Sequence, residues 1–205
     1  MPYRQTPAVR DRLAATRTRI IAAATALVHE SGYAGCSVAA VAERAGVATG
    51  TIYKFFPSKG ELFAEVFRQG SAREVAAASD AGLRVRTRDS VRASILAAVQ
   101  TFCTRALASP KFAYALIAEP VDPLVDVERL AFHDAYTDLF AAAIAQGVAD
   151  GELAQQDPRV SGAAIVGAIS DVLVVPLARG HDSAADTTVV TSLIAFVDRA
   201  LGKAQ

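Results

Sequence analysis

The stretch from Gly32 to Phe63, GYAGCSVAAVAERAGVATGTIYKFFPSKGELF, decides how the N-terminal part of this 205-residue chain folds. It contains two short apolar periodic segments, which are separated by Ala45-Gly46-Val47. Ser37 is a favourable N-cap for the first segment, and Gly46 suits the tight turn that follows it. Pro57 ends the second segment because proline cannot continue a helix. The spacing therefore predicts a helix-turn-helix, with one helix after Ser37 and another over about residues 49–56.

The second short helix begins with the small, polar run Ala48-Thr49-Gly50-Thr51. A helix that enters a major groove about 12 Å wide needs such an end, because bulky side chains would keep it from the bases. Gly50 allows close approach, and the two threonines offer hydroxyl and methyl contacts. Donors for phosphate oxygens follow at Tyr53, Lys54 and Lys59. The remaining apolar positions are expected to form the core of this unit: Val38, Val41, Ala42, Val47, Ile52 and Phe56.

These motifs resemble the TetR family of bacterial transcriptional regulators. The resemblance depends on a Gly-aromatic turn at Gly32-Tyr33, a Val-Ala-x-x-Ala-Gly-Val core that ends at Val47, and a Gly-Thr-x-Tyr-x-x-Phe-x-x-Lys run over residues 50–59. It covers about residues 11–67, and beyond them the chain is similar only in the number and layout of its helices. It implies a homodimeric repressor that a small-molecule effector releases from a palindromic double-stranded DNA operator.

The resemblance also implies specific DNA contacts. It assigns phosphate contacts to Ser37, Tyr53 and Lys59, and base or groove contacts to Thr49, Gly50, Thr51 and Lys54. Two positions depart from the family's common pattern. Ala48 stands where a capping serine is frequent, so we expect Thr49 to cap the helix in its place. Lys54 replaces a frequent histidine, which should strengthen phosphate binding and steepen its salt dependence.

The charge of the chain is unevenly distributed although the net charge is zero. Residues 1–60 carry eight basic and three acidic side chains, and the remainder carries 13 basic and 18 acidic ones. A basic N-terminal part indicates a polyanionic partner, and a solvated charged surface is the alternative. A basic arm over residues 1–10, with Arg4 and Arg10 and extended by Arg12, is a further candidate for minor-groove contact.

Hydrophobic periodicity predicts helices in the rest of the chain as well, and none of it indicates a strand. A polar stretch over residues 79–88 suggests a linker. The chain is therefore expected to be all-α with about nine helices. We divide it into a helix-turn-helix DNA-binding domain (residues 1–57) and a ligand-binding and dimerisation domain (residues 58–205). The further helices are expected over about residues 11–31, 58–78, 89–108, 110–119, 123–148, 158–178 and 186–201.

The last two predicted helices are candidates for a dimer interface. The final helix carries an apolar stripe, and the helix before it is rich in small residues that permit close packing. A four-helix homodimer interface follows, unless both stripes only cover the core of one subunit. The stripe consists of Val189, Leu193, Phe196, Val197 and Leu201, and the small residues are Gly162, Ala163, Ala164, Gly167 and Ala168.

The middle helices combine aromatic residues with a few polar ones, which is the composition of a small-molecule pocket. Helical spacing puts Arg129, His133, Tyr136 and Phe140 on one face. Core aromatics with surface charges are the alternative interpretation. The candidate ligand-binding residues are Phe102, Phe112, Tyr114, Glu119, Arg129, His133, Tyr136, Phe140 and Asp171.

The sequence offers no nucleophile-base motif and no glycine-rich phosphate loop. Two cysteines and three scattered histidines do not match metal-ligand spacing. We therefore expect no catalytic residue, no metal and no cofactor. A small-metabolite enzyme built on His133 with Glu119 or Asp171, and a helix-turn-helix protein used only for protein contacts, are the alternatives.

Uninterrupted apolar runs, such as residues 139–145 and 162–169, are shorter than the roughly 20 residues of a membrane span. The N-terminal residues also lack the apolar core of a signal peptide. We therefore expect no membrane association and a cytoplasmic location.

Overall fold

The computed structural model describes residues 6–86, 90–179 and 183–203, which form nine α-helices and no strand. The predicted all-α fold is thus confirmed for this part of the chain. The helices are α1 (Pro7–Ser31), α2 (Val38–Ala45), α3 (Thr49–Phe55), α4 (Lys59–Arg86), α5 (Val91–Ala108), α6 (Pro110–Ile117), α7 (Pro123–Ala149), α8 (Pro158–Arg179) and α9 (Ser183–Ala200).

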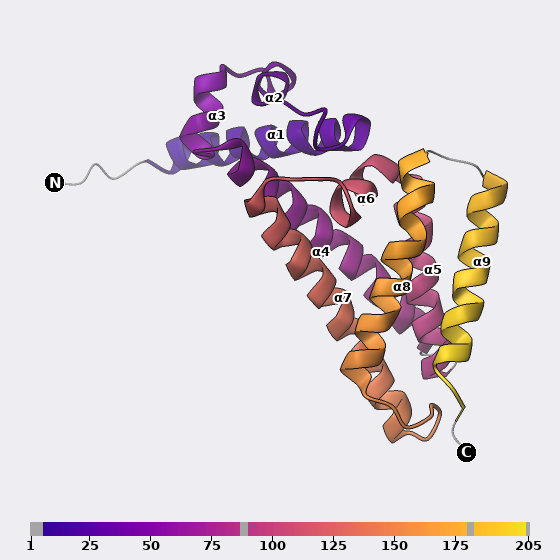
Figure 1. The fold of residues 1–205 in the computed structure, drawn as a ribbon. Helices are drawn as coiled ribbons and strands as arrows, with labels where there is room; N and C mark the ends of the chain where they lie inside the picture. Colours follow the sequence, from indigo (N-terminus) through magenta and orange to yellow (C-terminus); the bar gives the residue numbers. More distant parts are fainter. Residues whose placement is uncertain (1–5, 87–89, 180–182, 204–205) are drawn as a thin grey trace.

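The first three helices form a small unit, here called the head, which lies across one end of the longer helices α4–α9, here called the body (Figure 1). Within the body, α4 packs against α5 and α7, and α7 packs along α8. The head meets the body mainly through α1, which contacts both α4 and α6. The first turns of α4 contribute fully buried side chains to an apolar core that is continuous between the two parts: Leu62, Phe63, Val66 and Phe67.

The polar linker predicted over residues 79–88 is wrong for the residues that the structure describes. α4 is continuous to Arg86, and residues 87–89 lie outside the described part. Ala78 is fully buried, and a Cβ atom on Gly82 would lie 3.2 Å from the Ser94 carbonyl oxygen. The small residues of this stretch therefore let α4 approach α5, while its polar residues occupy the outer face.

The helix boundaries otherwise follow local signals. α1 begins at Pro7, earlier than predicted, because Thr6 caps it by accepting a hydrogen bond from the Val9 N–H. Ser58 accepts from the Glu61 N–H at the start of α4, and Ser90 accepts from the Ala93 N–H at the start of α5. Each is a polar residue that satisfies a free N–H group of the first helical turn.

α8 is the one helix in the described ranges that is long and apolar enough, by length and composition alone, to cross a membrane. Uninterrupted apolar runs do not reveal this helix, because polar residues such as Ser161 and Asp171 divide its apolar sequence. Core helices of soluble proteins meet the same criteria, and α8 packs against α6, α7 and α9. This feature is therefore weak evidence for a membrane.

Candidate nucleic-acid interface and ligand cavity

The turn of the helix-turn-helix is built as the sequence predicts. Ser37 caps α2 by accepting a hydrogen bond from the Ala40 N–H at 3.1 Å. α2 ends at Gly46, whose φ of 64° and ψ of 42° are left-handed. This conformation favours glycine because a Cβ atom would be strained there. The Val47 N–H then bonds to the Ala42 carbonyl at 3.0 Å, which fixes the angle at which α3 leaves.

The N-terminal end of α3 is uncapped by any side chain. Ala48 is the N-cap residue and Thr49 is the first helical residue, so the expectation that Thr49 caps this helix is wrong. Thr49 and Gly50 are exposed, and a Cβ atom on Gly50 would meet nothing within 4 Å. The free N–H groups of α3 and its small side chains therefore face open space.

The remaining predicted DNA contacts lie around this end. Ser37, Tyr53 and Lys54 are exposed, and Thr51 is half-buried. Lys59 is half-buried, with its Nζ 4.5 Å from the ring centroid of Tyr33. A lysine above an aromatic face is held by cation–π attraction, so Lys59 has a structural partner within the protein.

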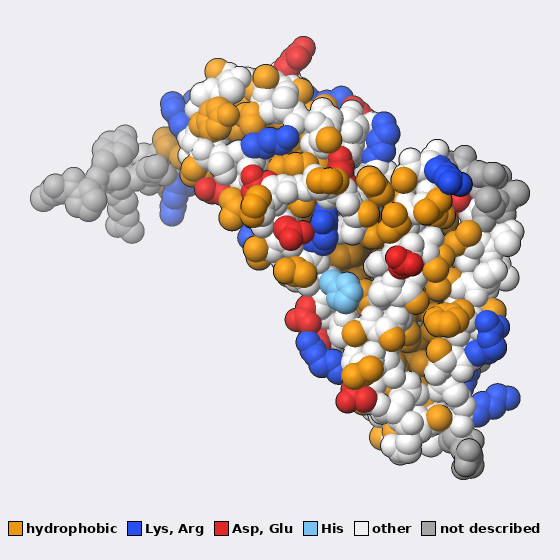
Figure 2. All heavy atoms as spheres, viewed as in Figure 1, with side chains coloured by type: hydrophobic (Ala, Val, Ile, Leu, Met, Phe, Trp, Pro, Cys, Tyr) orange, Lys and Arg blue, Asp and Glu red, His pale blue; other side chains and the backbone are white. Residues whose placement is uncertain are grey.

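Part of the basic excess of the head is neutralised within the protein. Arg44 donates to both carboxylate oxygens of Glu30 at 2.7 Å, and Arg17 lies 3.3 Å from Glu65. The Arg44 hydrogen bond lowers the pKa of Glu30. Basic side chains nevertheless remain spread over the head in Figure 2. Within α1–α3, four cations have no ion pair with another described residue: Arg10, Arg12, Arg19 and Lys54.

The predicted basic arm differs from the structure. Residues 7–10 already belong to α1, so Arg10 and Arg12 extend from a helix rather than from a flexible arm. Arg4 lies outside the described residues.

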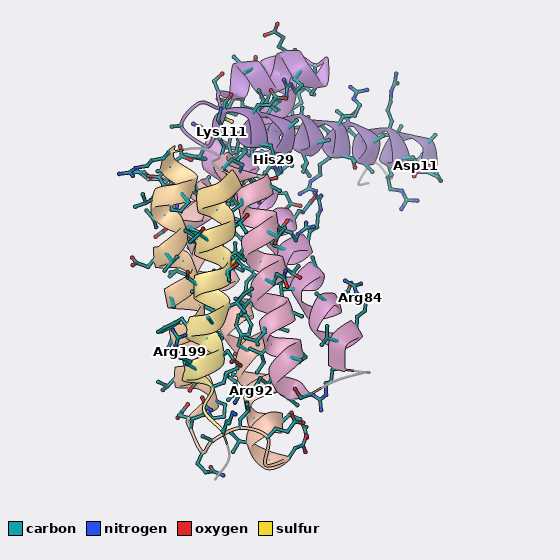
Figure 3. The ribbon with its side chains drawn as sticks, turned by 90° about the vertical axis from the view of Figure 1, so that its right-hand side faces the viewer. Asp11, His29, Arg84, Arg92, Lys111 and Arg199 are labelled. Carbon is teal, nitrogen blue, oxygen red and sulfur yellow. The ribbon has the colours of Figure 1, made fainter. Side chains whose placement is uncertain are left out.

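The junction between head and body is held by residues of α6 and the turn that follows it. Glu119 accepts the backbone N–H groups of Tyr33 and Ala34, both at 2.9 Å, and so fixes the turn after α1. His29 of α1 stacks on Phe112 of α6, with ring centroids 4.6 Å apart and planes inclined by 9°. His29 and Lys111 are labelled at this junction in Figure 3. The head is thus attached to α6 as well as to α4.

A hollow of about 350 Å³ lies between α4, α5, α6 and α7, directly beneath this junction. Its lining includes three of the predicted ligand-binding residues, Phe102, Phe112 and Tyr136. Further apolar lining comes from Leu116, Ile117 and Phe132. This volume includes solvent at the open mouth of the hollow. A mostly apolar lining with a few polar groups is typical of small-molecule sites.

The charged groups of the hollow are Glu74 of α4 and Arg105 of α5. The Arg105 Nε donates to Glu74 Oε2 at 2.5 Å, and Arg105 Nη2 donates to Glu74 Oε1 at 2.8 Å. The Tyr136 hydroxyl donates to the Glu74 backbone carbonyl at 2.9 Å. Burial raises the pKa of Tyr136 well above its ordinary value, so the hydroxyl stays protonated and available as a donor.

Sequence reasoning missed Glu74 and Arg105. Arg105 follows Phe102 by three positions, so helical spacing could have put both on one face. Nothing in the local sequence indicates Glu74, because its position depends on how α4 packs against α5.

The other predicted ligand residues lie outside this hollow. Phe140 lines a second hollow of about 650 Å³ farther along α4, α5 and α7. Glu119 and Arg129 are engaged at the end of α6, where Arg129 donates to the carbonyls of Ala115 and Glu119. Three more line neither hollow: Tyr114 is half-buried on α6, and His133 and Asp171 are exposed on α7 and α8.

The prediction that Arg129, His133, Tyr136 and Phe140 share one face of α7 is wrong for His133. The buried face consists of Val125, Phe132, Tyr136 and Phe140, and His133 points to solvent beside it. Phe132 takes its place in the aromatic cluster, with its ring centroid 5.0 Å from that of Tyr136.

Only part of the predicted dimer stripe is available on the surface. Leu193, Val197 and Leu201 are buried in the subunit's own core. A Cβ atom on Gly162 would lie 2.8 Å from the Thr137 carbonyl oxygen, so this glycine serves the packing of α8 on α7. Apolar side chains nevertheless gather along α8 and α9 in Figure 2. The exposed large ones are Val160, Val172, Val175 and Phe196.

The described residues thus form an all-α helix-turn-helix protein with a hollow helical body. Residues 20–66 match the family described as bacterial regulatory proteins, tetR family. The match covers most of the helix-turn-helix head and the first turns of α4, so the head of the chain has the sequence pattern of this family.

Curated relatives resemble the chain in the head. The HTH-type transcriptional repressor KstR of Rhodococcus jostii (strain RHA1) is 52% identical over 46 residues, which is 22% of each chain. The matched stretch therefore spans about a fifth of the length of such relatives.

Solved structures show that the fold extends to the whole chain. The fatty acid degradation regulator FadR from Bacillus halodurans has a TM-score of 0.73 at 22% identity, covering 98% of this chain and 97% of that one. A transcriptional regulator FadR from Bacillus subtilis in complex with stearoyl-CoA has a TM-score of 0.69 at 20% identity, covering 87% and 97%. At this identity the likeness concerns the fold.

Proposed function

We propose that the chain is a homodimeric transcriptional repressor that binds a palindromic operator and leaves it when a small molecule occupies the body. The observation that carries this proposal is the open, small and polar end of α3 within a tetR-family helix-turn-helix. The proposed DNA-contacting residues are Ser37, Thr49, Gly50, Thr51, Tyr53, Lys54 and Lys59.

The proposed division of labour follows the two parts of the molecule. Residues 1–57 read DNA, and residues 58–205 bind the effector and dimerise. KstR, which resembles the head, is a repressor, and the B. subtilis FadR that shares the fold binds stearoyl-CoA. Both support a chain in which a DNA-binding head is attached to a ligand-binding body.

Dimerisation would use the outer face of α8 and α9. Phe196 is 49% exposed, and Gly167 of α8 would meet nothing within 4 Å if it carried a Cβ atom. Large exposed apolar residues beside small ones suit a close helix–helix contact. A two-fold dimer also gives the two heads that successive major grooves require, about 34–36 Å apart.

The effector would act through the hollow beneath the junction. Its walls include α4 and α6, and both helices contact α1 of the head. An occupant that binds more tightly to one head position than to another shifts the population between the two. The separation of the heads would then no longer fit the operator.

Enzymatic activity is not proposed for the body. The acid–base set considered from the sequence is dispersed, since Glu119 holds the turn after α1 while His133 and Asp171 are exposed on different helices. A cytoplasmic location completes the proposal, because an operator is found there.

The test is a selection from random double-stranded DNA with the purified full chain at moderate salt. An enriched palindrome supports the proposal. No enrichment by a folded dimer, together with no binding to nonspecific DNA, would overturn it.

Two variants then separate the roles of α3 residues. Lys54→Ala should weaken binding to all sequences and reduce the salt slope by about 1 for each subunit of the dimer, because an exposed lysine contacts phosphate. Thr51→Ala should change the selected sequence, because it removes a groove contact. Equal losses on specific and random DNA for Thr51→Ala would contradict base reading by this residue. Lys54 is preferred to Lys59 here because Lys59 also packs on Tyr33.

A further inference from the structure

The hollow beneath the head contains an ion pair whose cation can accept a different anion. Arg105 presents two N–H groups to Glu74 in the bidentate geometry that guanidinium groups form with carboxylates. The pair lies at the mouth, with the side chains of Arg105 and Glu74 44% and 25% exposed. Glu74 therefore occupies the position that the carboxylate of a ligand would take.

The surroundings of the pair favour an anion over a cation. Among the described lining residues, Glu74 is the one carboxylate and Arg105 is the one cation. An incoming anion can reach the Arg105 guanidinium, which is the more exposed member of the pair. An incoming cation would have to reach the less exposed Glu74, whose two carboxylate oxygens both accept from Arg105.

The other lining residues determine the chemical character of the rest of the ligand. Phe102, Leu116 and Phe132 offer apolar surface, and the Tyr136 hydroxyl is already bonded to the Glu74 carbonyl. The occupant therefore combines one terminal anionic group with an apolar remainder of modest size, since the hollow measures about 350 Å³ including its mouth.

We propose that the effector is a small amphipathic carboxylic acid whose carboxylate replaces Glu74 on Arg105 while its apolar part fills the hollow. This inference rests on the proposed role of the hollow as the effector site. It gives Glu74 the role of an internal competitor, which occupies Arg105 in the absence of effector.

Occupation of the hollow is linked to the head by two contacts. Glu74 belongs to α4, the helix that continues from the head, so its release removes a tie between α4 and α5. Phe112 lines the hollow on one side and stacks on His29 of α1 on the other. A ligand that presses on Phe112 therefore acts on α1 directly.

The experiment is a calorimetric titration of the full chain, without DNA, with octanoate and with the uncharged octanamide. Three variants are compared: Arg105→Gln, Glu74→Gln, and Arg159→Gln as a matched control. Arg159 is exposed on α8, where it pairs with Asp134 and Asp138. The same substitution there removes a guanidinium group remote from the hollow.

Octanoate should bind the wild-type chain more tightly than octanamide does. Arg105→Gln should weaken octanoate about tenfold or more and leave octanamide unchanged, as expected for the loss of a charge-assisted hydrogen bond. Glu74→Gln should tighten octanoate by up to about fivefold, because the competing surface pair is removed. Arg159→Gln should change neither ligand.

Equal affinities of the wild-type chain for octanoate and octanamide would overturn the proposal. The absence of octanoate binding to the Glu74→Gln variant, in which Arg105 has lost its carboxylate partner, would also overturn it. If Arg105→Gln does not fold, Arg105→Lys retains the charge without the bidentate fork, and unchanged octanoate affinity in that variant also overturns it. Because the titration involves no DNA, a failure of the DNA selection is recognised separately.

Discussion

The head and the body are both helical, but different kinds of sequence information determine them. In the head, caps and one left-handed glycine specify short helices, and the functional surface is a contiguous run of exposed residues on α3. In the body, long helices are apolar on several faces, and the polar groups of the hollow come from helices far apart in sequence. A local pattern can therefore indicate a recognition helix, whereas a cavity is known only once the helices are packed.

Two helical glycines illustrate this difference between the head and the body. Gly50 in α3 faces open space, and Gly70 in α4 faces the ring of Phe112, whose Cζ would lie 2.3 Å from an added Cβ. The first glycine leaves room for a partner outside the protein, and the second leaves room for a side chain inside it. The same substitution at the two sites should therefore affect different properties.

Gly50→Ala should produce the largest effect, which is a loss of DNA binding without a loss of stability. Alanine fits the helical backbone of α3 and raises its helix propensity, so the free energy of unfolding should stay equal or rise by up to about 1 kcal/mol. The added methyl occupies the space needed for close approach, at a cost of the order of a specific base contact, about 1–3 kcal/mol in each half-site. Binding to the selected operator, measured by fluorescence anisotropy, should fall accordingly.

The control for Gly50→Ala is the melting temperature of the same preparation. A loss of operator binding that accompanies a lower melting temperature would indicate misfolding of α3 rather than a blocked groove. Unchanged operator binding would contradict the proposed orientation of this helix end toward DNA.

Gly70→Ala should act in the opposite sense, on stability first. Phe112 is buried and stacked between His29 and Phe67, at centroid distances of 4.6 and 5.6 Å, so its ring has little freedom to move aside. Inserting a methyl into such a packed site costs about 1–3 kcal/mol, which exceeds the gain in helix propensity. Urea unfolding should show a lower midpoint with an unchanged slope. A midpoint equal to that of the wild type would mean that the junction adapts easily.

Sequence periodicity predicted the head almost completely. The bounds of α2 and its buried residues follow from Ser37, Gly46 and the apolar spacing between them. The local errors were the cap of α3, which begins at Thr49 without any side-chain cap, and the start of α1, which lies at Pro7 within the predicted basic arm. These features depend on neighbours within a few residues, which is why the sequence alone indicates them.

The body was predicted as a set of helices but not as a site. The aromatic composition of the middle helices singled out Phe102, Phe112 and Tyr136, and these line the hollow because large aromatic groups of these helices are buried together. It could not predict that His133 points to solvent, since a small rotation of α7 decides between adjacent faces. Glu119 illustrates the same limit, because its partners lie 86 and 85 residues away in the chain.

The smallest expected effect concerns His29, which belongs to the head but stacks on a ring of the body. Burial lowers its pKa below the ordinary value of 6.5, and Arg73 acts in the same direction while Glu74 opposes it. The unfolded chain therefore binds the proton before the folded chain does. Stability is complete above pH 6.5 and declines as the pH falls from there through the lower pKa of the folded state.

His29→Phe should remove this decline while keeping a ring against Phe112. The free energy of unfolding of the wild type should fall between about pH 7.5 and 5.5, and that of the variant should change less over the same interval. His29 is exposed although one face of its ring is stacked, so solvent screening should keep the difference below about 1 kcal/mol. Urea unfolding at several pH values measures it, and the lowered pKa of Glu30 does not interfere because that carboxylate titrates at lower pH. If the free energies of unfolding of the two proteins change equally with pH, protonation of His29 does not alter the strength of its contact with Phe112. The stack would then not couple head and body.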